Sequence, residues 1–116
     1  MGVRKEGSPV IKEKLAGGTG AAQVSALLSE AEFYGAGRLF SKVTLTPGSS
    51  IGWHDHFDEV EYYYILSGKG QFTNPDHTVS DVGPGDVCTM NPDEGHAIAC
   101  TGDEPLVFIA LILFNK

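Results

Sequence analysis

The stretch that decides the fold runs from Gly48 to Gly68 and reads GSSIGWHDHFDEVEYYYILSG. It contains two of the four histidines of the chain, His54 and His56, separated by a single residue. On extended backbone these two side chains project to one face of the strand, and Asp55 projects to the other. Two imidazoles on one face form a chelating pair, so the spacing predicts a metal site.

A carboxylate follows the pair on the same stretch. Glu61 lies five residues after His56, which is an odd offset on extended backbone. It can reach the same interior only if a bulge or a bend within residues 57–60 resets the alternation. From Glu61 the strand should continue regularly, so we expect Tyr63 and Ile65 to share its face.

A third histidine sits in a second stretch, GDVCTMNPDEGHAIAC, which covers residues 85–100. Gly85 and Asp86 form a turn that leads into a strand. Pro92 and Gly95 bracket a further turn, which places His96 at the start of the next strand. Rigid turns of this kind can hold a third imidazole against the first two.

The rest of the chain is typical of an all-β protein, because apolar residues alternate and turn residues recur every 8–12 positions. The expected strands are 38–45, 61–66, 71–73, 77–82, 87–90, 96–101 and 106–114. We expect a sandwich or barrel, with 61–66 and 71–73 paired as a hairpin. Residues 21–33 have a weak helical pattern that equally suits a strand followed by a turn. Residues 1–20 suggest an extended or poorly ordered arm.

Composition restricts the function. The chain has 116 residues, which is one domain's worth, and its 8 basic and 15 acidic residues give a net charge of −7. Such a charge argues against nucleic acid and anionic membranes as partners. The longest apolar run, 106–114, is too short to span a bilayer. With no secretion signal and two cysteines, Cys88 and Cys100, we expect a cytoplasmic protein with reduced thiols.

The two histidine-bearing stretches resemble the two sequence motifs of the cupin family. The second motif has the family spacing of eleven between Gly85 and His96, but its proline is displaced by one residue to Pro92, and Cys100 stands where the family has an asparagine. The resemblance covers about residues 39–113. All defining positions of the first motif are filled, by Gly48, His54, His56, Glu61 and Gly68.

The resemblance implies an antiparallel jelly-roll β-barrel over residues 36–116, preceded by an N-terminal arm and lead-in strands over 1–35, together one structural domain. Carried over residue by residue, the ligands of a divalent metal are His54, His56, Glu61 and His96. Three neutral imidazoles and one carboxylate leave positions open and suit Mn, Fe, Ni or Co, and also Zn.

A site of this kind supports two functions. The first is a metal-dependent enzyme, a dioxygenase, isomerase or decarboxylase that acts on a small organic metabolite. The alternative is a metal-containing module that binds or senses a small molecule without turnover. The sequence indicates no separate general base or nucleophile. Because one fold can host many activities, the resemblance does not decide between the two functions.

Tyr63 is the residue we expect beside the metal ligands, because it shares the face of Glu61. Its hydroxyl would contact substrate or metal-bound water, or the ring would simply pack in the core. Cys100 shares the face of His96, and we interpret it as a small buried hydrophobe. Trp53 is expected to pack at the edge of the motif, and His77 to be exposed and away from the metal.

Charged residues near the motif receive simpler interpretations. Alternation along 38–45 predicts that Arg38 and Lys42 point outward, which leaves a mainly apolar cavity. Carboxylates that flank the ligands are interpreted as solvated loop groups; these are Asp55, Asp58 and Glu59.

The C-terminal apolar run, residues 106–114, shows no alternation, so both of its faces should be covered. The three consecutive tyrosines, 62–64, also place an aromatic ring on the outer face of the sheet. A partner sheet, the N-terminal arm or a second subunit could cover the outer face. We expect a homodimer, in agreement with the cupin resemblance.

Overall fold

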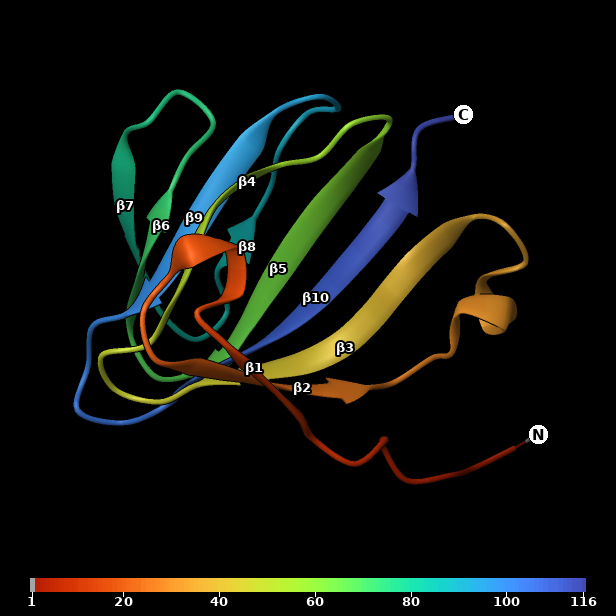
Figure 1. The fold of residues 1–116 in the computed structure, drawn as a ribbon, viewed down its shortest axis with the longest axis horizontal. Helices are drawn as coiled ribbons and strands as arrows, with labels where there is room; N and C mark the ends of the chain where they lie inside the picture. The colour runs from red at the N-terminus through yellow and green to blue at the C-terminus, as the bar shows by residue number, and fades with distance from the viewer. Residues whose placement is uncertain (1) are drawn as a thin grey trace.

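The computed structural model describes residues 2–116 and consists almost entirely of β-strands in two antiparallel sheets (Figure 1). The larger sheet has the order β1-β2-β3-β10-β5-β8, and the smaller has the order β4-β9-β6-β7. The strands are β1 (Val10–Glu13), β2 (Ala21–Ala26), β3 (Gly37–Leu45), β4 (Ser50–Asp55), β5 (Glu59–Ser67), β6 (Gly70–Thr73), β7 (Val79–Val82), β8 (Val87–Cys88), β9 (Gly95–Cys100) and β10 (Leu106–Phe114). This arrangement confirms the expected jelly roll.

The core fills the space between the sheets and follows from the period-two pattern. On β10 every second residue faces inward and is at most 3% exposed: Leu106, Phe108, Ala110 and Ile112. The residues between them are only half-buried. The expected strand 106–114 is thus confirmed in its bounds, but one of its faces is more open than a strand covered on both sides would be.

Two details of the expected topology are wrong. Among residues 2–116 no ladder joins the edges of the two sheets, so the barrel is not closed. The hairpin between β5 and β6 also does not form, because β5 pairs with β10 and β8 whereas β6 pairs with β7 and β9. The turn at Gly68 instead carries the chain between the sheets. Gly68 has φ +85°, and a Cβ there would lie 2.2 Å from the carbonyl oxygen of Pro105.

The N-terminal arm is more ordered than its composition suggests. β1 pairs with β2 at the edge of the larger sheet, and the short 3-10 turn η1 (Leu15–Gly17) lies against β4 of the smaller sheet. Gly52 permits this approach, because a Cβ there would lie 2.1 Å from the carbonyl oxygen of Ala16. The arm therefore bridges the two sheets on one side (Figure 1).

The region with mixed helical and strand signals, residues 21–33, forms a strand and then a turn. β2 covers its first half, and the 3-10 turn η2 (Glu30–Phe33) its second. Tertiary pairing with β1 and β3 decides the outcome over local propensity. No helix in residues 2–116 combines the length and apolar character needed to cross a membrane.

Candidate metal centre

Three elements from both sheets bring the four predicted ligands together. His54 on β4 and His96 on β9 are direct partners across the ladder of the smaller sheet. His56 follows the end of β4, and Glu61 projects from β5 of the facing sheet. The bend predicted within residues 57–60 is present at Asp58, whose φ is +58°. This bend lets consecutive strands in different sheets point their side chains at one place.

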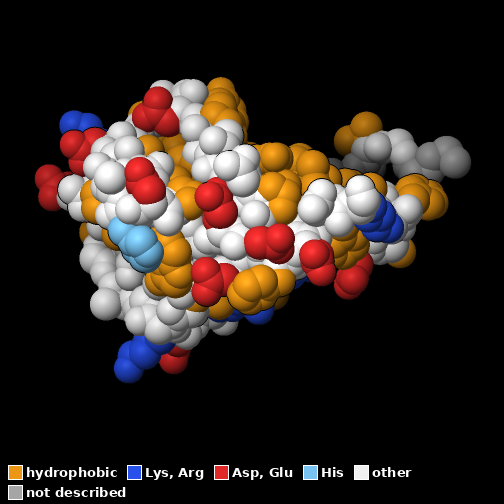
Figure 2. Space-filling view, turned by 90° about the horizontal axis from the view of Figure 1, so that it is seen from above, with side chains coloured by type: hydrophobic (Ala, Val, Ile, Leu, Met, Phe, Trp, Pro, Cys, Tyr) orange, Lys and Arg blue, Asp and Glu red, His pale blue; other side chains and the backbone are white. Residues whose placement is uncertain are grey.

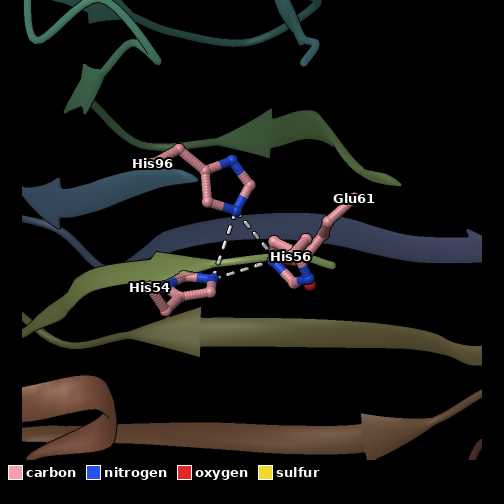
Figure 3. Close-up of side chains that lie close together, drawn as sticks. All are labelled: His54, His56, Glu61 and His96. Carbon is pink, nitrogen blue, oxygen red and sulfur yellow. Dashed lines mark hydrogen bonds and ion pairs between the residues drawn. The ribbon is translucent and has the colours of Figure 1, made fainter. Parts of the chain in front are cut away.

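The four side chains converge on a single point (Figure 3). One ligand atom from each residue can be chosen so that all lie within 4.8 Å of one another. Oε1 of Glu61 lies 3.2 Å from Nε2 of His54, 3.0 Å from Nε2 of His56 and 3.0 Å from Nε2 of His96. Three imidazole nitrogens thus surround one carboxylate oxygen, in a cluster that is mostly buried.

Hydrogen bonds on the far side of two rings fix which nitrogen carries the proton. Nδ1 of His54 donates to the carbonyl oxygen of Gly52 at 2.8 Å, and a carbonyl can only accept. Nδ1 of His56 donates to the carboxylate of Glu59 at 2.8 Å. Both neutral rings therefore present an Nε2 lone pair to the centre. Nδ1 of His96 is buried without a hydrogen-bond partner in the described part of the chain.

This donor set fits a divalent cation. Lone pairs of imidazole nitrogens and a carboxylate oxygen repel one another at these separations unless a proton or a cation lies between them. Imidazole and carboxylate together are the ligands of Mn, Fe, Co, Ni and Zn. Partners behind the ligating rings, such as Gly52 and Glu59, are a regular feature of protein metal sites.

Electrostatics within the cluster favour an ionised carboxylate. Burial alone would raise the pKa of Glu61, but the three protonatable imidazoles around its carboxylate outweigh burial and hold that pKa well below its usual value. Burial alone would lower the pKa of His56, yet its bonds to Glu61 and Glu59 raise it. Burial lowers the pKa of His96. The centre therefore carries a fixed negative charge, and a cation that binds there must displace the proton that His56 holds more tightly than a free imidazole does.

Tyr63 lies beside the cluster, as its position on the strand predicts. Its hydroxyl donates to Oε1 of Glu61 at 2.9 Å and lies 3.4 Å from Nε2 of His96. The ring stacks on that of His96 with centroids 5.0 Å apart. Burial and the charge of Glu61 raise the pKa of Tyr63 well above its usual value, so the group stays a neutral donor.

Glu59 is not the solvated loop carboxylate that we expected. β5 begins at Glu59, which therefore shares the inner face of Glu61, and the residue is 8% exposed. Besides bonding His56, it accepts two hydrogen bonds from Arg38, from Nε at 2.8 Å and from Nη2 at 2.7 Å. The Arg38 guanidinium lowers the pKa of Glu59 despite its burial. Asp55 and Asp58 are exposed, as expected.

Arg38 itself is a second correction. Alternation predicts that it points outward, but the register shifts between Ile112 and Leu113 of β10, which pair with Leu39 and Gly37. Arg38 is the extra residue of this bulge; its side chain stays 43% exposed, but it turns to the cavity side and pairs with Glu59. Lys42 does lie on the outer side, where it pairs with Glu6 of the arm.

The cluster lies at a cavity of about 420 Å³ between the sheets. His54, His56, Glu61 and Tyr63 contribute to its wall. Most other lining residues are apolar and come from β2, β3, β4, β10 and η1, and the remaining polar ones are Lys12 and Arg38. The cavity is therefore mainly apolar, as expected, and its wall also contains two cationic side chains, Lys12 and Arg38, at exposed positions.

Residues that we expected to lie outside the site do so. His77 is exposed and stacks on Trp53 with ring centroids 4.2 Å apart. Cys100 is 5% exposed in the core, where its thiol donates to the carbonyl oxygen of Glu104.

Figure 2 shows that carboxylates are spread over the face seen from above and that basic side chains are few there. These exposed carboxylates are separate from Glu61, the buried carboxylate of the cluster.

Comparisons with known proteins agree with this architecture. Residues 41–112 match the family model described as the cupin domain. An oxalate-binding protein of Thermotoga maritima is 41% identical over 97 residues, which cover 84% of this chain and 79% of that protein. The crystal structure of a predicted oxalate decarboxylase from Thermotoga maritima superposes with a TM-score of 0.93 at 38% identity, covering 98% of this chain and 99% of the other.

A more distant structure shares the fold alone. A cupin-like protein of Thermotoga maritima superposes with a TM-score of 0.76 at 23% identity, over 99% of this chain and 82% of the other. The match to the family model extends over more than half of the chain, and the structural match at 38% identity extends over nearly all of it. The chain belongs to the cupin family.

Proposed function

We propose that this chain binds one divalent cation through His54, His56, Glu61 and His96, and that a small organic acid binds to the cation through a carboxylate. The observation that carries the proposal is the convergence of three Nε2 atoms and one buried carboxylate oxygen at a cavity. Four protein ligands leave open positions on Mn, Fe, Ni or Co, and also on Zn when its coordination expands.

Two features support an acid as the ligand. A divalent cation attracts a carboxylate, and the exposed Lys12 at the cavity adds to the attraction, whereas the charge of Arg38 is offset by Glu59. Two relatives at 41% and 38% identity carry names that refer to oxalate, as a ligand in one case and as a substrate in the other. A small carboxylate is therefore the chemical class we assign to the site.

Catalysis is the form of this function that we favour, by a metal-dependent dioxygenase, isomerase or decarboxylase. A bound metal would supply Lewis-acid polarisation of the bound carboxylate. The chain's own contribution is to hold Glu61 ionised, to fix the tautomers of His54 and His56, and to keep a neutral Tyr63 hydroxyl beside them.

Binding without turnover is the second candidate, and one observation favours it. Outside the cluster and Tyr63, the polar residues that line the cavity are Lys12 and Arg38, and Arg38 is held by Glu59. The described residues thus offer few free groups for proton transfer.

The test uses metal-loaded protein and oxalate. Calorimetric titration should show saturable oxalate binding that disappears in His54→Ala. Formate and carbon dioxide are then assayed, since decarboxylation of oxalate with uptake of one proton gives both. Their release supports the enzyme, and saturable binding with oxalate recovered intact supports the binding module. Oxalate binding that is equal with and without metal would refute the proposal.

We also propose a homodimer formed through the outer face of the larger sheet. The outward residues of β10, including Ile109, are only half-buried, and Tyr64 and Val87 on the neighbouring strands are 48% and 63% exposed. Exposed apolar surface of this kind is typical of an interface. We retain the cytoplasm as the proposed location, where Cys88 and Cys100, both free and buried, stay reduced.

A further inference from the structure

We infer that the acid bound at this site carries an apolar chain of several carbons, which occupies the cavity beside the metal centre. The inference rests on the proposed function and names the class of ligand more narrowly. It follows from the size of the cavity, from the chemistry of its wall and from the way in which the wall is built.

The cavity is larger than oxalate requires. Its volume of about 420 Å³ lies in the range of pockets that enclose ligands of drug size, roughly 300–1,000 Å³. Oxalate consists of two directly linked carboxylates, so on the metal it would fill only the end of the cavity nearest the cluster. The remaining volume is available to a longer molecule.

The wall of this remaining volume is mostly apolar, and its two charged residues, Lys12 and Arg38, stand at exposed positions. Its accessible apolar surface comes from half-buried side chains, Val24 and Leu39 on the larger sheet and Leu15 on the N-terminal arm. None of these side chains can hydrogen-bond a second charged group. Covering such a wall with carbon in place of water is favourable in proportion to the apolar area covered.

The apolar wall is also fixed in place. The residues behind it, Val43, Ile51 and Phe108, are at most 5% exposed and stand on paired strands within the core, against which Leu15, Val24 and Leu39 pack. The N-terminal arm contributes Leu15 and Lys12 to the same wall. A preformed wall of this kind binds an apolar chain without first having to be ordered, which lowers the cost of binding.

A series of linear 2-oxo acids tests the inference. These acids keep the oxygen–carbon–carbon–oxygen chelating group of oxalate and replace one carboxylate oxygen with an alkyl chain. Dissociation constants for pyruvate, 2-oxobutanoate, 2-oxopentanoate, 2-oxohexanoate and 2-oxooctanoate are measured by calorimetry on protein loaded with Mn²⁺, with oxalate as reference. We expect affinity to rise about fourfold for each added methylene until the cavity is full.

Two outcomes contradict the inference, and they can be told apart. If oxalate binds in a metal-dependent manner but affinity is flat or falls along the series, the apolar chain is refuted and the proposed function stands. If neither oxalate nor any 2-oxo acid binds to the loaded protein, the proposed function fails and the inference fails with it.

A cavity-filling variant provides an independent check. Val24 is a half-buried lining residue on β2, so Val24→Phe should stop the rise in affinity at shorter acids. Val79→Phe introduces the same change at an exposed position on β7, and it should keep the full dependence on chain length. An identical series in both variants would contradict the assignment of the chain to this cavity, and melting temperatures establish that both proteins are folded.

Discussion

Glu59 provides a test of how the protein supports its metal ligands. The carboxylate accepts a hydrogen bond from Nδ1 of His56 and two from Arg38, and it is 8% exposed. Glu59→Gln keeps the shape of the side chain but removes the charge, and its amide nitrogen must then face a donor of one partner. The bond from Nδ1 of His56 then goes to a neutral amide oxygen or is replaced by a contact between two donors, so the tautomer that presents the Nε2 lone pair to the metal is less strongly favoured.

The expected magnitude is a 10–100-fold loss of metal affinity, which is the usual effect of removing a partner of a ligating histidine. Competition of the purified protein with a chromophoric chelator for Mn²⁺ or Zn²⁺ at pH 7.5 measures it directly. Asp58→Asn is the matched control, because it removes the same charge at an exposed neighbour and asparagine tolerates the φ of +58° there. Affinities of Glu59→Gln and Asp58→Asn within twofold of each other would refute the reasoning.

Three further predictions concern the cluster and the outer face. Metal affinity should fall as the pH drops below about 6.5, because protons compete for the imidazole nitrogens. The raised pKa of His56 makes this loss begin nearer neutrality. Affinity that stays constant from pH 8 to 4 in metal titrations would argue against histidine ligation. Tyr63→Phe removes a buried hydrogen bond to the carboxylate of Glu61 and should lower the free energy of unfolding by about 1 kcal/mol. This loss should appear as a melting temperature lower by about 4 °C. An unchanged melting temperature would show that this bond does not contribute to stability. Ile109→Lys places a charge on the outer face of β10 and should convert the proposed dimer to a monomer in sedimentation analysis; a monomer already in the unmodified protein would contradict the interface.

Most of the fold could be predicted because alternation and turn residues act locally. The expected strand 106–114 coincides with β10, and the jelly roll follows from strand spacing together with the motif resemblance. Pairing between strands is decided by contacts distant in sequence, so the hairpin of β5 with β6 was a wrong prediction. The turn at Gly68 has the sequence of a hairpin turn, but packing against Pro105 directs it across to the other sheet.

The site, like the fold, was predictable where local spacing decides the structure and not where contacts distant in sequence decide it. Sequence spacing alone predicts that His54, His56 and Glu61 point into the same space between the sheets, once the bend at Asp58 is allowed for. The role of Arg38 could not be found in this way, because a bulge in β3 cancels the alternation on which the prediction rests. Glu59 was missed because it lies within residues 57–60, where the bend resets the alternation, so its face could not be counted back from Glu61.

The central claim is that four side chains hold one divalent cation. It is tested most directly by plasma mass spectrometry of the untagged protein, produced with supplements of Mn, Fe, Co, Ni or Zn in turn. We predict close to one equivalent of metal per chain, lost in His96→Ala and retained in His77→Ala, which removes a surface imidazole stacked on Trp53. A small fraction of an equivalent under every supplement, or equal metal in both variants, would contradict the account.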